Sequence, residues 1–171
     1  MISEKIEKKL NEQIQKEFYS AYLYLSMEAY FASRSLNGFA NYFRVQAQEE
    51  RDHAMMFFDF VNHVGGKVKL GMIDGPKSEF ESIEEVFKMA LDHERYVTSS
   101  IYSIVDVAIE ERDHKTNTFL QWFVTEQAEE EATAEANLDK VKLIGSDGRG
   151  ILMLDAEMAQ RVYTPPQTSQ A

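Results

Sequence analysis

Hydrophobic residues recur at intervals of three and four along most of the chain, which is the spacing of amphipathic helices. The first such run covers residues 4 to 32 and ends where the sequence Ser-Arg-Ser-Leu-Asn-Gly, residues 33–38, interrupts it. A second run covers residues 38 to 64, with Asn37 as the expected N-cap and Gly65 as a stop signal. The pattern therefore predicts two long helices joined by a short loop.

Two further long helices and one short helix are predicted in the second half. Residues 83 to 111 carry the third apolar stripe, which begins behind a capping box that starts at Ser82. After a break at residues 113–115, a fourth stripe continues until Gly145 closes it. A fifth and shorter stripe ends where Pro165 stops the helical pattern.

The segment between the second and third helices, residues 65–81, contains glycines and a proline and predicts an extended surface crossing. Four helices of about 27 residues are each about 40 Å long, whereas about 17 residues of extended chain span about 50 Å. The segment can therefore return along the whole bundle, which predicts an all-α, ferritin-like four-helix bundle with one long crossover and a short C-terminal fifth helix. An ordinary up-down bundle with a flexible loop is the alternative.

These boundaries also predict how the chain is organised. We expect residues 1–145 to form the bundle, residues 146–164 to form the short helix, and residues 165–171 to be a flexible tail. The short helix carries more apolar surface than one bundle needs, so we expect it to lie at contacts with neighbouring subunits.

Polar residues interrupt each of the four long apolar stripes, where the pattern asks for leucine or phenylalanine. They lie within about one turn of the midpoints of their helices, so they would converge at one level of the bundle. On the fourth helix, periodicity does not distinguish Glu130 from Glu131. On the first helix, Tyr24 lies seven residues after Glu17 and therefore on the same side. The set consists of Glu17, Glu50, His53, Glu94, Gln127 and Glu130 or Glu131.

Four carboxylates in one apolar interior cannot all stay ionised unless cations neutralise them. Glutamates and one histidine offer mostly hard oxygen ligands, and the Glu-x-x-His spacing of Glu50 and His53 places both donors on one helix face. Such a donor set favours non-haem iron, with manganese next, whereas structural zinc sites more often use Cys and His. The alternative is a buried Glu–His pair that hydrogen bonds satisfy without a metal.

Composition narrows the function further. The chain has 171 residues, with 18 Lys and Arg against 29 Asp and Glu, so its formal net charge is −11. This balance argues against binding to nucleic acid and to anionic membrane surfaces. The absence of cysteine excludes disulfides, thiolate metal sites and cysteine nucleophiles. No apolar run approaches 18 residues and the N-terminus lacks a signal-peptide pattern, so we expect a cytoplasmic location.

Several polar residues lie outside the predicted layer. A second Glu-Arg-Asp-His sequence at residues 111–114 lies about 25 Å along the helix from Glu94, so we expect a solvated helix end there. His63 is expected on the surface, and His93 is a minor candidate ligand. A group of glutamates flanks the layer and suggests an additional cation position: Glu49, Glu126 and Glu129.

The chain resembles the non-haem bacterial and archaeal ferritins over nearly its whole length. The segments that carry the resemblance are EFYSAYLYLSM at 17–27, FRVQAQEERDHAM at 43–55 and FLQWFVTEQAEEE at 119–131. By this likeness, Glu17, Glu50 and His53 would hold one iron ion. Glu50, Glu94 and Glu130 would hold the second, with Glu50 bridging the two ions. The resemblance thus selects Glu130 over Glu131 and places Gln127 beside the centre.

The resemblance also implies features beyond the two-iron centre. Glu49, Glu126, Glu129 and Glu130 would form a third iron site, and Tyr24 would hydrogen-bond near the centre and donate an electron. Members of the family assemble into a hollow shell of 24 subunits, with the fifth helix near the fourfold axes. The turn between the third and fourth helices would lie near the threefold pores, where one or more of three residues would line an iron access route: Glu110, Asp113 and His114.

Bacterioferritins resemble the chain as well but carry a second Glu-x-x-His and a haem-ligating methionine. Asp52 stands where that methionine would fall, although Met55 and Met56 are near, so haem is not expected. The sequence therefore predicts an iron-storage ferroxidase that oxidises Fe²⁺ to Fe³⁺ with O₂ or H₂O₂ and deposits ferric mineral inside its shell. A di-iron oxidase that consumes peroxide or a small substrate, and a helical oligomerisation module with an incidental metal site, are the alternatives.

Overall fold

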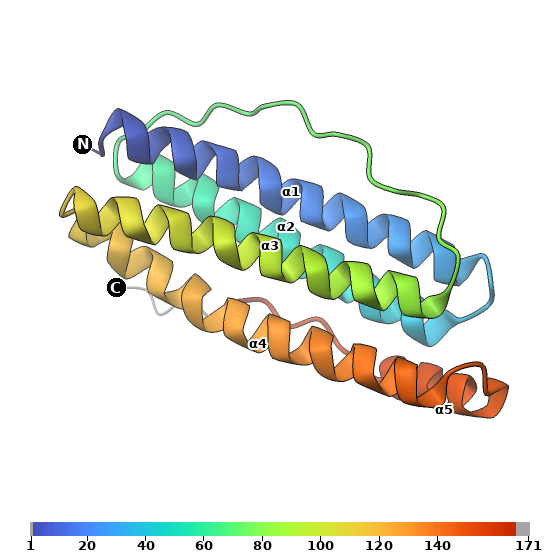
Figure 1. The fold of residues 1–171 in the computed structure, drawn as a ribbon. Coiled ribbons are helices and arrows are strands. Elements are labelled where there is room, and N and C mark those ends of the chain that lie inside the picture. Colours follow the sequence, from blue (N-terminus) through green and yellow to red (C-terminus); the bar gives the residue numbers. More distant parts are fainter. Residues whose placement is uncertain (1, 167–171) are drawn as a thin grey trace.

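The computed structural model describes residues 2–166, which form five helices and contain no strand (Figure 1). The boundaries agree with the periodicity to within one or two residues for the four long helices. The helices are α1 (Glu4–Ala32), α2 (Asn37–His63), α3 (Ile83–Glu110), α4 (His114–Ile144) and α5 (Gly148–Met158).

The segment between α2 and α3 runs along the outside of the bundle from one end to the other, so that α2 and α3 point the same way (Figure 1). Side chains of α1 fasten it: Asn11 accepts from the backbone N–H of Lys69 (2.6 Å) and donates to the carbonyl of Lys67 (2.9 Å). Ser26 donates to the carbonyl of Lys77 (2.6 Å). The predicted ferritin-like topology is confirmed, and the up-down alternative is wrong.

Local capping explains three of the predicted helix ends. Ser82 accepts from the backbone N–H of Glu85 (3.0 Å) at the start of α3. Asp113 accepts from the N–H of Thr116 (3.1 Å) at the start of α4. Gly145 ends α4 with a φ of 59°, a left-handed conformation that glycine adopts without the penalty of a Cβ atom.

The start of α2 differs from the expectation. Asn37 is the first residue of the helix and not its cap, and the preceding Leu36 offers no side-chain hydrogen bond. The cap comes from elsewhere in the chain, because the carboxylate of Asp155 on α5 accepts from the backbone N–H of Phe39 (2.9 Å). The short fifth helix is therefore built into the end of the bundle.

The fifth helix is also shorter than its apolar stripe suggests. It ends at Met158, whereas residues up to 164 were expected to belong to it, and Val162 within that stretch is 79% exposed. The chain then runs back along α2, where the Asn41 amide donates to the carbonyls of Met158 (3.2 Å) and Arg161 (2.9 Å). Of the expected tail, residues 167–171 lie outside the described residues.

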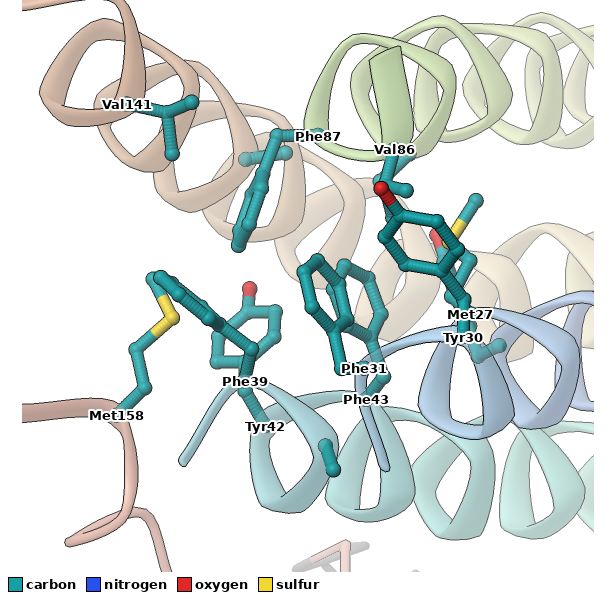
Figure 2. Packing of buried hydrophobic residues seen from close by; sticks show 14 of the residues in the cluster. Met27, Tyr30, Phe31, Phe39, Tyr42, Phe43, Val86, Phe87, Val141 and Met158 are labelled. Carbon is teal, nitrogen blue, oxygen red and sulfur yellow. The ribbon is translucent and has the colours of Figure 1, made fainter. Parts of the chain in front are cut away.

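The hydrophobic core has two parts. One is rich in aromatic rings, among them Phe31 stacked on Phe43 with ring centres 5.6 Å apart (Figure 2). The other lies toward the opposite end of the bundle and includes Ile6, Leu10 and Phe123. Along α1, the second part ends with Ile14 and the first begins with the leucine and tyrosine at 23 and 24, so the layer between them is where buried polar residues occur.

Gly38→Ala tests how α5 is seated. A Cβ atom at Gly38 would lie 1.6 Å from the carbonyl oxygen of Asp155, so α5 must move and weaken the cap on α2. We expect a destabilisation of about 1–3 kcal/mol, seen as a melting temperature lower by several degrees. Gly75→Ala is the control, because a Cβ atom there meets nothing within 4 Å. Equal melting temperatures for the two variants would contradict this account of the α5 contact.

Candidate metal centre

The polar layer receives side chains from all four long helices, and each of them is at most 8% exposed. Two of the helices each contribute two members, which are three residues apart and therefore lie on the same face of their helix. Its members are Glu17 from α1, Glu50 and His53 from α2, Glu94 from α3, and Gln127 and Glu130 from α4.

Three of these residues form a compact group. Glu17, Glu50 and His53 each offer one ligand atom, and these atoms lie within 4.8 Å of one another. The imidazole Nδ1 of His53 is 3.3 Å from a carboxylate oxygen of Glu50, three residues earlier on the same helix. These are the residues assigned to the first iron ion from the sequence, and the fold brings them together.

The other members lie around Glu94. The hydroxyl of Tyr24 donates to one oxygen of Glu94, and the amide of Gln127 donates to the other (3.1 Å). Gln127 also donates to the hydroxyl of Thr98 (3.3 Å). Each oxygen of Glu94 therefore has a partner, which fixes the orientation of its carboxylate.

Glu130 and Glu50 are linked through an amide that the sequence reasoning missed. The side-chain N–H group of Gln46 donates to Glu130 (2.8 Å) and, more weakly, to Glu50 (3.4 Å). Glu130 is 8% exposed, whereas Glu131 is only partly buried, so of these two acids the fold buries Glu130 in the polar layer.

The layer is electrostatically unfavourable without cations. Burial raises the pKa of Glu17 and of Glu94 to about 8, and the neighbouring charges of Glu50 and Glu130 respectively act in the same direction. The pKa of Glu50 is raised well above its usual value, first by burial and then by the charges of Glu94 and Glu130. Cations bound here would relieve both the desolvation and the repulsion.

Two buried polar atoms have no hydrogen-bond partner among the described residues: Oε2 of Glu17 and Oε1 of Gln46. Such atoms are rare in folded proteins and call for an explanation, such as an ion or a water molecule. The free oxygen of Glu17 belongs to the residue that groups with Glu50 and His53. Carboxylate oxygens and one imidazole suit Fe²⁺ or Mn²⁺, so the residues present fit a metal ion of this kind.

Gln13 is a second residue that the sequence reasoning missed. It is fully buried, and its side-chain N–H group donates to Oε1 of Glu17 (2.7 Å). Gln13 and Gln46 each stand four residues before a glutamate of the centre, one helical turn away. That spacing was visible in the sequence, because residues i and i+4 share a helix face.

The flanking acids are placed unevenly. Glu49 is partly buried and pairs with the guanidinium of Arg161 (2.5 Å), whereas Glu129 is exposed. Burial raises the pKa of Glu49 and of Glu126, and the charge of Glu130 contributes to both shifts. The fold thus brings two of the three acids close to Glu130 and leaves Glu129 at the surface.

The remaining histidines lie outside the centre. His93 directs Nε2 to the hydroxyl of Ser20 (2.7 Å) and packs against Tyr24, and burial lowers its pKa to about 4. It is not part of the group formed by Glu17, Glu50 and His53. His63 is exposed, as expected.

The second Glu-Arg-Asp-His sequence forms the exposed turn that caps α4, which agrees with a solvated helix end. At the position that would carry a haem methionine, the carboxylate of Asp52 accepts from the hydroxyl of Tyr163. Among residues 2–166, no helix is long and apolar enough to cross a membrane.

Comparison with known proteins gives matches along most of the chain. The ferritin-like domain matches residues 7–144. The bacterial non-heme ferritin of Staphylococcus epidermidis is 39% identical over 163 residues, which are 95% of this chain and 98% of that protein. The bacterial non-heme ferritin of Bacteroides fragilis is 42% identical over 161 residues, covering 94% and 100% of the two chains.

Solved structures of ferritins are also similar to this chain. An open pore ferritin from the archaeon Archaeoglobus fulgidus is 50% identical, with a TM-score of 0.93 over 95% of this chain and 100% of that one. A humanized archaeal ferritin is likewise 50% identical, with a TM-score of 0.95. Since sequence, fold and the buried carboxylate layer lead to the same family, the chain belongs to the ferritins.

Proposed function

We propose that the protein stores iron by oxidising Fe²⁺ to Fe³⁺ at a two-iron carboxylate centre and depositing the product as ferric mineral inside a closed shell. The observation that carries this proposal is the buried Oε2 of Glu17, which lacks a hydrogen-bond partner within residues 2–166 and belongs to the group that Glu17 forms with Glu50 and His53. An ionised acid held in this way costs stability unless a cation binds to it, and membership of the ferritins names iron as that cation.

The residues of the polar layer would bind two ferrous ions. Glu17, Glu50 and His53 bind one, and Glu50, Glu94 and Glu130 bind the other, so Glu50 bridges them. Each ion gives one electron, and O₂ with two protons becomes H₂O₂. If H₂O₂ is the oxidant, it accepts the same two electrons and two protons and becomes water. The carboxylates favour the ferric product because their negative charge stabilises the higher charge on iron.

Tyr24 and Gln127 act on the second ion through Glu94, which would be one of its ligands. Both donate to Glu94, which sets the direction of its carboxylate toward the centre. The two-electron balance above needs no electron from Tyr24, whose hydrogen bond to Glu94 makes it a candidate donor only for a further one-electron step. Glu49, Glu126 and Glu130, with Glu129 at the surface next to them, would form the third cation position. Residues Glu110, Asp113 and His114, at the turn between α3 and α4, are candidates for the access route.

The shell is proposed to contain 24 subunits, assembled in the cytoplasm. Large apolar side chains remain exposed on the single chain, which supports burial against other copies. On α5 these are Leu152 and Met153, at 64% and 69% exposure, and on the crossover they are Leu70, Met72 and Ile73. Contact between subunits through α5 would cover the first pair.

Addition of Fe²⁺ to the metal-free protein in air tests the function. We expect rapid growth of ferric absorbance, with iron that co-elutes with a protein particle the size of a closed shell. Protein preloaded with Zn²⁺ is the control, because a redox-inert ion in the same ligands should slow the oxidation. A small oligomer that releases soluble ferric product would instead favour an oxidase acting on another substrate.

A further inference from the structure

A continuous line of hydrogen bonds connects the surface between α1 and α3 to the first iron position. The ammonium group of Lys16 donates to the hydroxyl of Ser100 (2.7 Å), which donates to Oε1 of Gln13 (2.6 Å). The amide N–H group of Gln13 then donates to Oε1 of Glu17 (2.7 Å). Three residues, Lys16, Ser100 and Gln13, thus link solvent to a buried acid, and we call them the Lys16 relay.

The chemistry of its outer end gives the relay a fixed direction. A lysine ammonium only donates hydrogen bonds, so the hydroxyl of Ser100 must accept from Lys16 and can donate its single proton inward. The Gln13 side chain therefore meets Ser100 with its carbonyl oxygen and meets Glu17 with its N–H group. A flipped amide would leave the hydroxyl proton of Ser100 facing an N–H group and the carboxylate of Glu17 facing a carbonyl oxygen.

The inner end of the relay selects one oxygen of Glu17. Oε1 is occupied by Gln13, whereas Oε2 has no partner among the described residues. Glu17 as a whole is 1% exposed, so water in bulk does not compete for this atom. The carboxyl group is thus held through Oε1, and Oε2 is left either to the proton that the neighbouring carboxyl of Glu50 helps to retain or to a metal ion.

We propose that the Lys16 relay positions Glu17 so that Oε2 alone is presented to the first ferrous ion, and that it thereby sets the affinity of this position. The inference rests on the proposed function only in naming iron as the natural ion. Gln13, Ser100 and Lys16 act through Glu17 and do not touch the ion. Fixing a ligand through its partners in this way raises metal affinity because less freedom is lost on binding.

The same face of the bundle contains a second hydrogen-bonded lysine–serine pair, which does not connect to the metal centre. Lys9 donates to the hydroxyl of Ser103 (3.2 Å), and this hydroxyl donates to the backbone carbonyl of Ser100 within its own helix (2.8 Å). The pair has the same residue types, with its serine about one turn and its lysine about two turns from those of the relay, but it reaches no residue of the centre. Ser103→Ala is therefore the control for Ser100→Ala.

The test is calorimetric titration of metal-free protein with Zn²⁺, which reports ion binding without oxidation. We expect Gln13→Leu to weaken binding of the first ion by about 10- to 100-fold, the usual effect of removing a partner of a metal ligand. Ser100→Ala should weaken it less and in the same direction, and Ser100→Thr, which keeps a hydroxyl, should restore it. Ser103→Ala should bind as the wild type does.

Ferrous oxidation supplies a second readout. At low Fe²⁺ the Ser100→Ala variant should be slower than the wild type, and at saturating Fe²⁺ the two rates should approach each other, because the loss is one of affinity. Circular dichroism confirms that each variant is folded. Unchanged zinc affinity in both Gln13→Leu and Ser100→Ala would overturn the relay. Failure of the wild type to oxidise iron would overturn the proposed function and leave the zinc result to stand by itself.

Discussion

Glu50→Ala is expected to abolish rapid oxidation of Fe²⁺ while the helices stay intact. Glu50 is the one carboxylate that groups with Glu17 and His53 and also carries strong charge interactions with Glu94 and Glu130. Without it the two ions lose their common ligand and the geometry that allows paired electron transfer. Mutation of a residue that only hydrogen-bonds to a metal ligand usually lowers metal affinity or activity by about 10- to 100-fold. Since Glu50 would itself be a ligand, we expect the initial rate of oxidation to fall by at least about 100-fold.

Stopped-flow absorbance of ferric products measures the rate, and circular dichroism checks the fold. Glu135→Ala is the matched control: Glu135 also carries a carboxylate, but it is exposed and pairs with Arg95 on the surface (3.2 Å). That variant should oxidise iron as the wild type does. An unchanged initial rate in Glu50→Ala would remove the two-iron centre from the proposal.

The sequence predicted the helices and the level at which polar residues converge because both depend on local spacing. Apolar residues at three- and four-residue intervals place one face of each helix, and a glutamate on that face is then buried by the same geometry. Glu94 illustrates this: its position on the stripe of α3 predicted its burial, and it is 2% exposed. The length of the crossover predicted the direction of α3 for an equally simple reason.

What the sequence did not predict depends on contacts between distant residues. The cap of α2 comes from Asp155, more than 100 positions away, so no local signal at Asn37 could reveal it. The pairing of Arg161 with Glu49 arises because the chain turns back after α5, which its apolar stripe did not indicate. Gln13 differs from these, since its spacing from Glu17 was visible, but its link to Ser100 depends on how α1 packs on α3.

The acidity of the centre also makes metal-free and metal-loaded protein respond oppositely to pH. Glu17 and Glu94 have a pKa of about 8 in the folded protein, above the usual value of 4.5. The folded state therefore holds protons that the unfolded chain has lost. Stability from these groups is complete below about pH 4.5 and disappears as pH rises through about 8.

We expect the melting temperature of metal-free protein to fall between pH 6.5 and 8. This window avoids His93, whose lowered pKa of about 4 acts in the opposite direction below pH 6.5. Zn²⁺ should bind more tightly as pH rises, since its ligands must lose their protons first. The gain in melting temperature on zinc loading should therefore be larger at pH 8 than at pH 6.5.

Glu17→Gln separates this effect from other titrations, because glutamine cannot ionise. The variant should lose less stability between pH 6.5 and 8 than the wild type, and it should release about one proton fewer when zinc binds, as measured in weakly buffered solution. Equal proton release by the two proteins would mean that Glu17 is already ionised before the metal arrives. The free oxygen of Glu17 would then need a partner other than its own proton, and the link between its burial and metal binding would be lost.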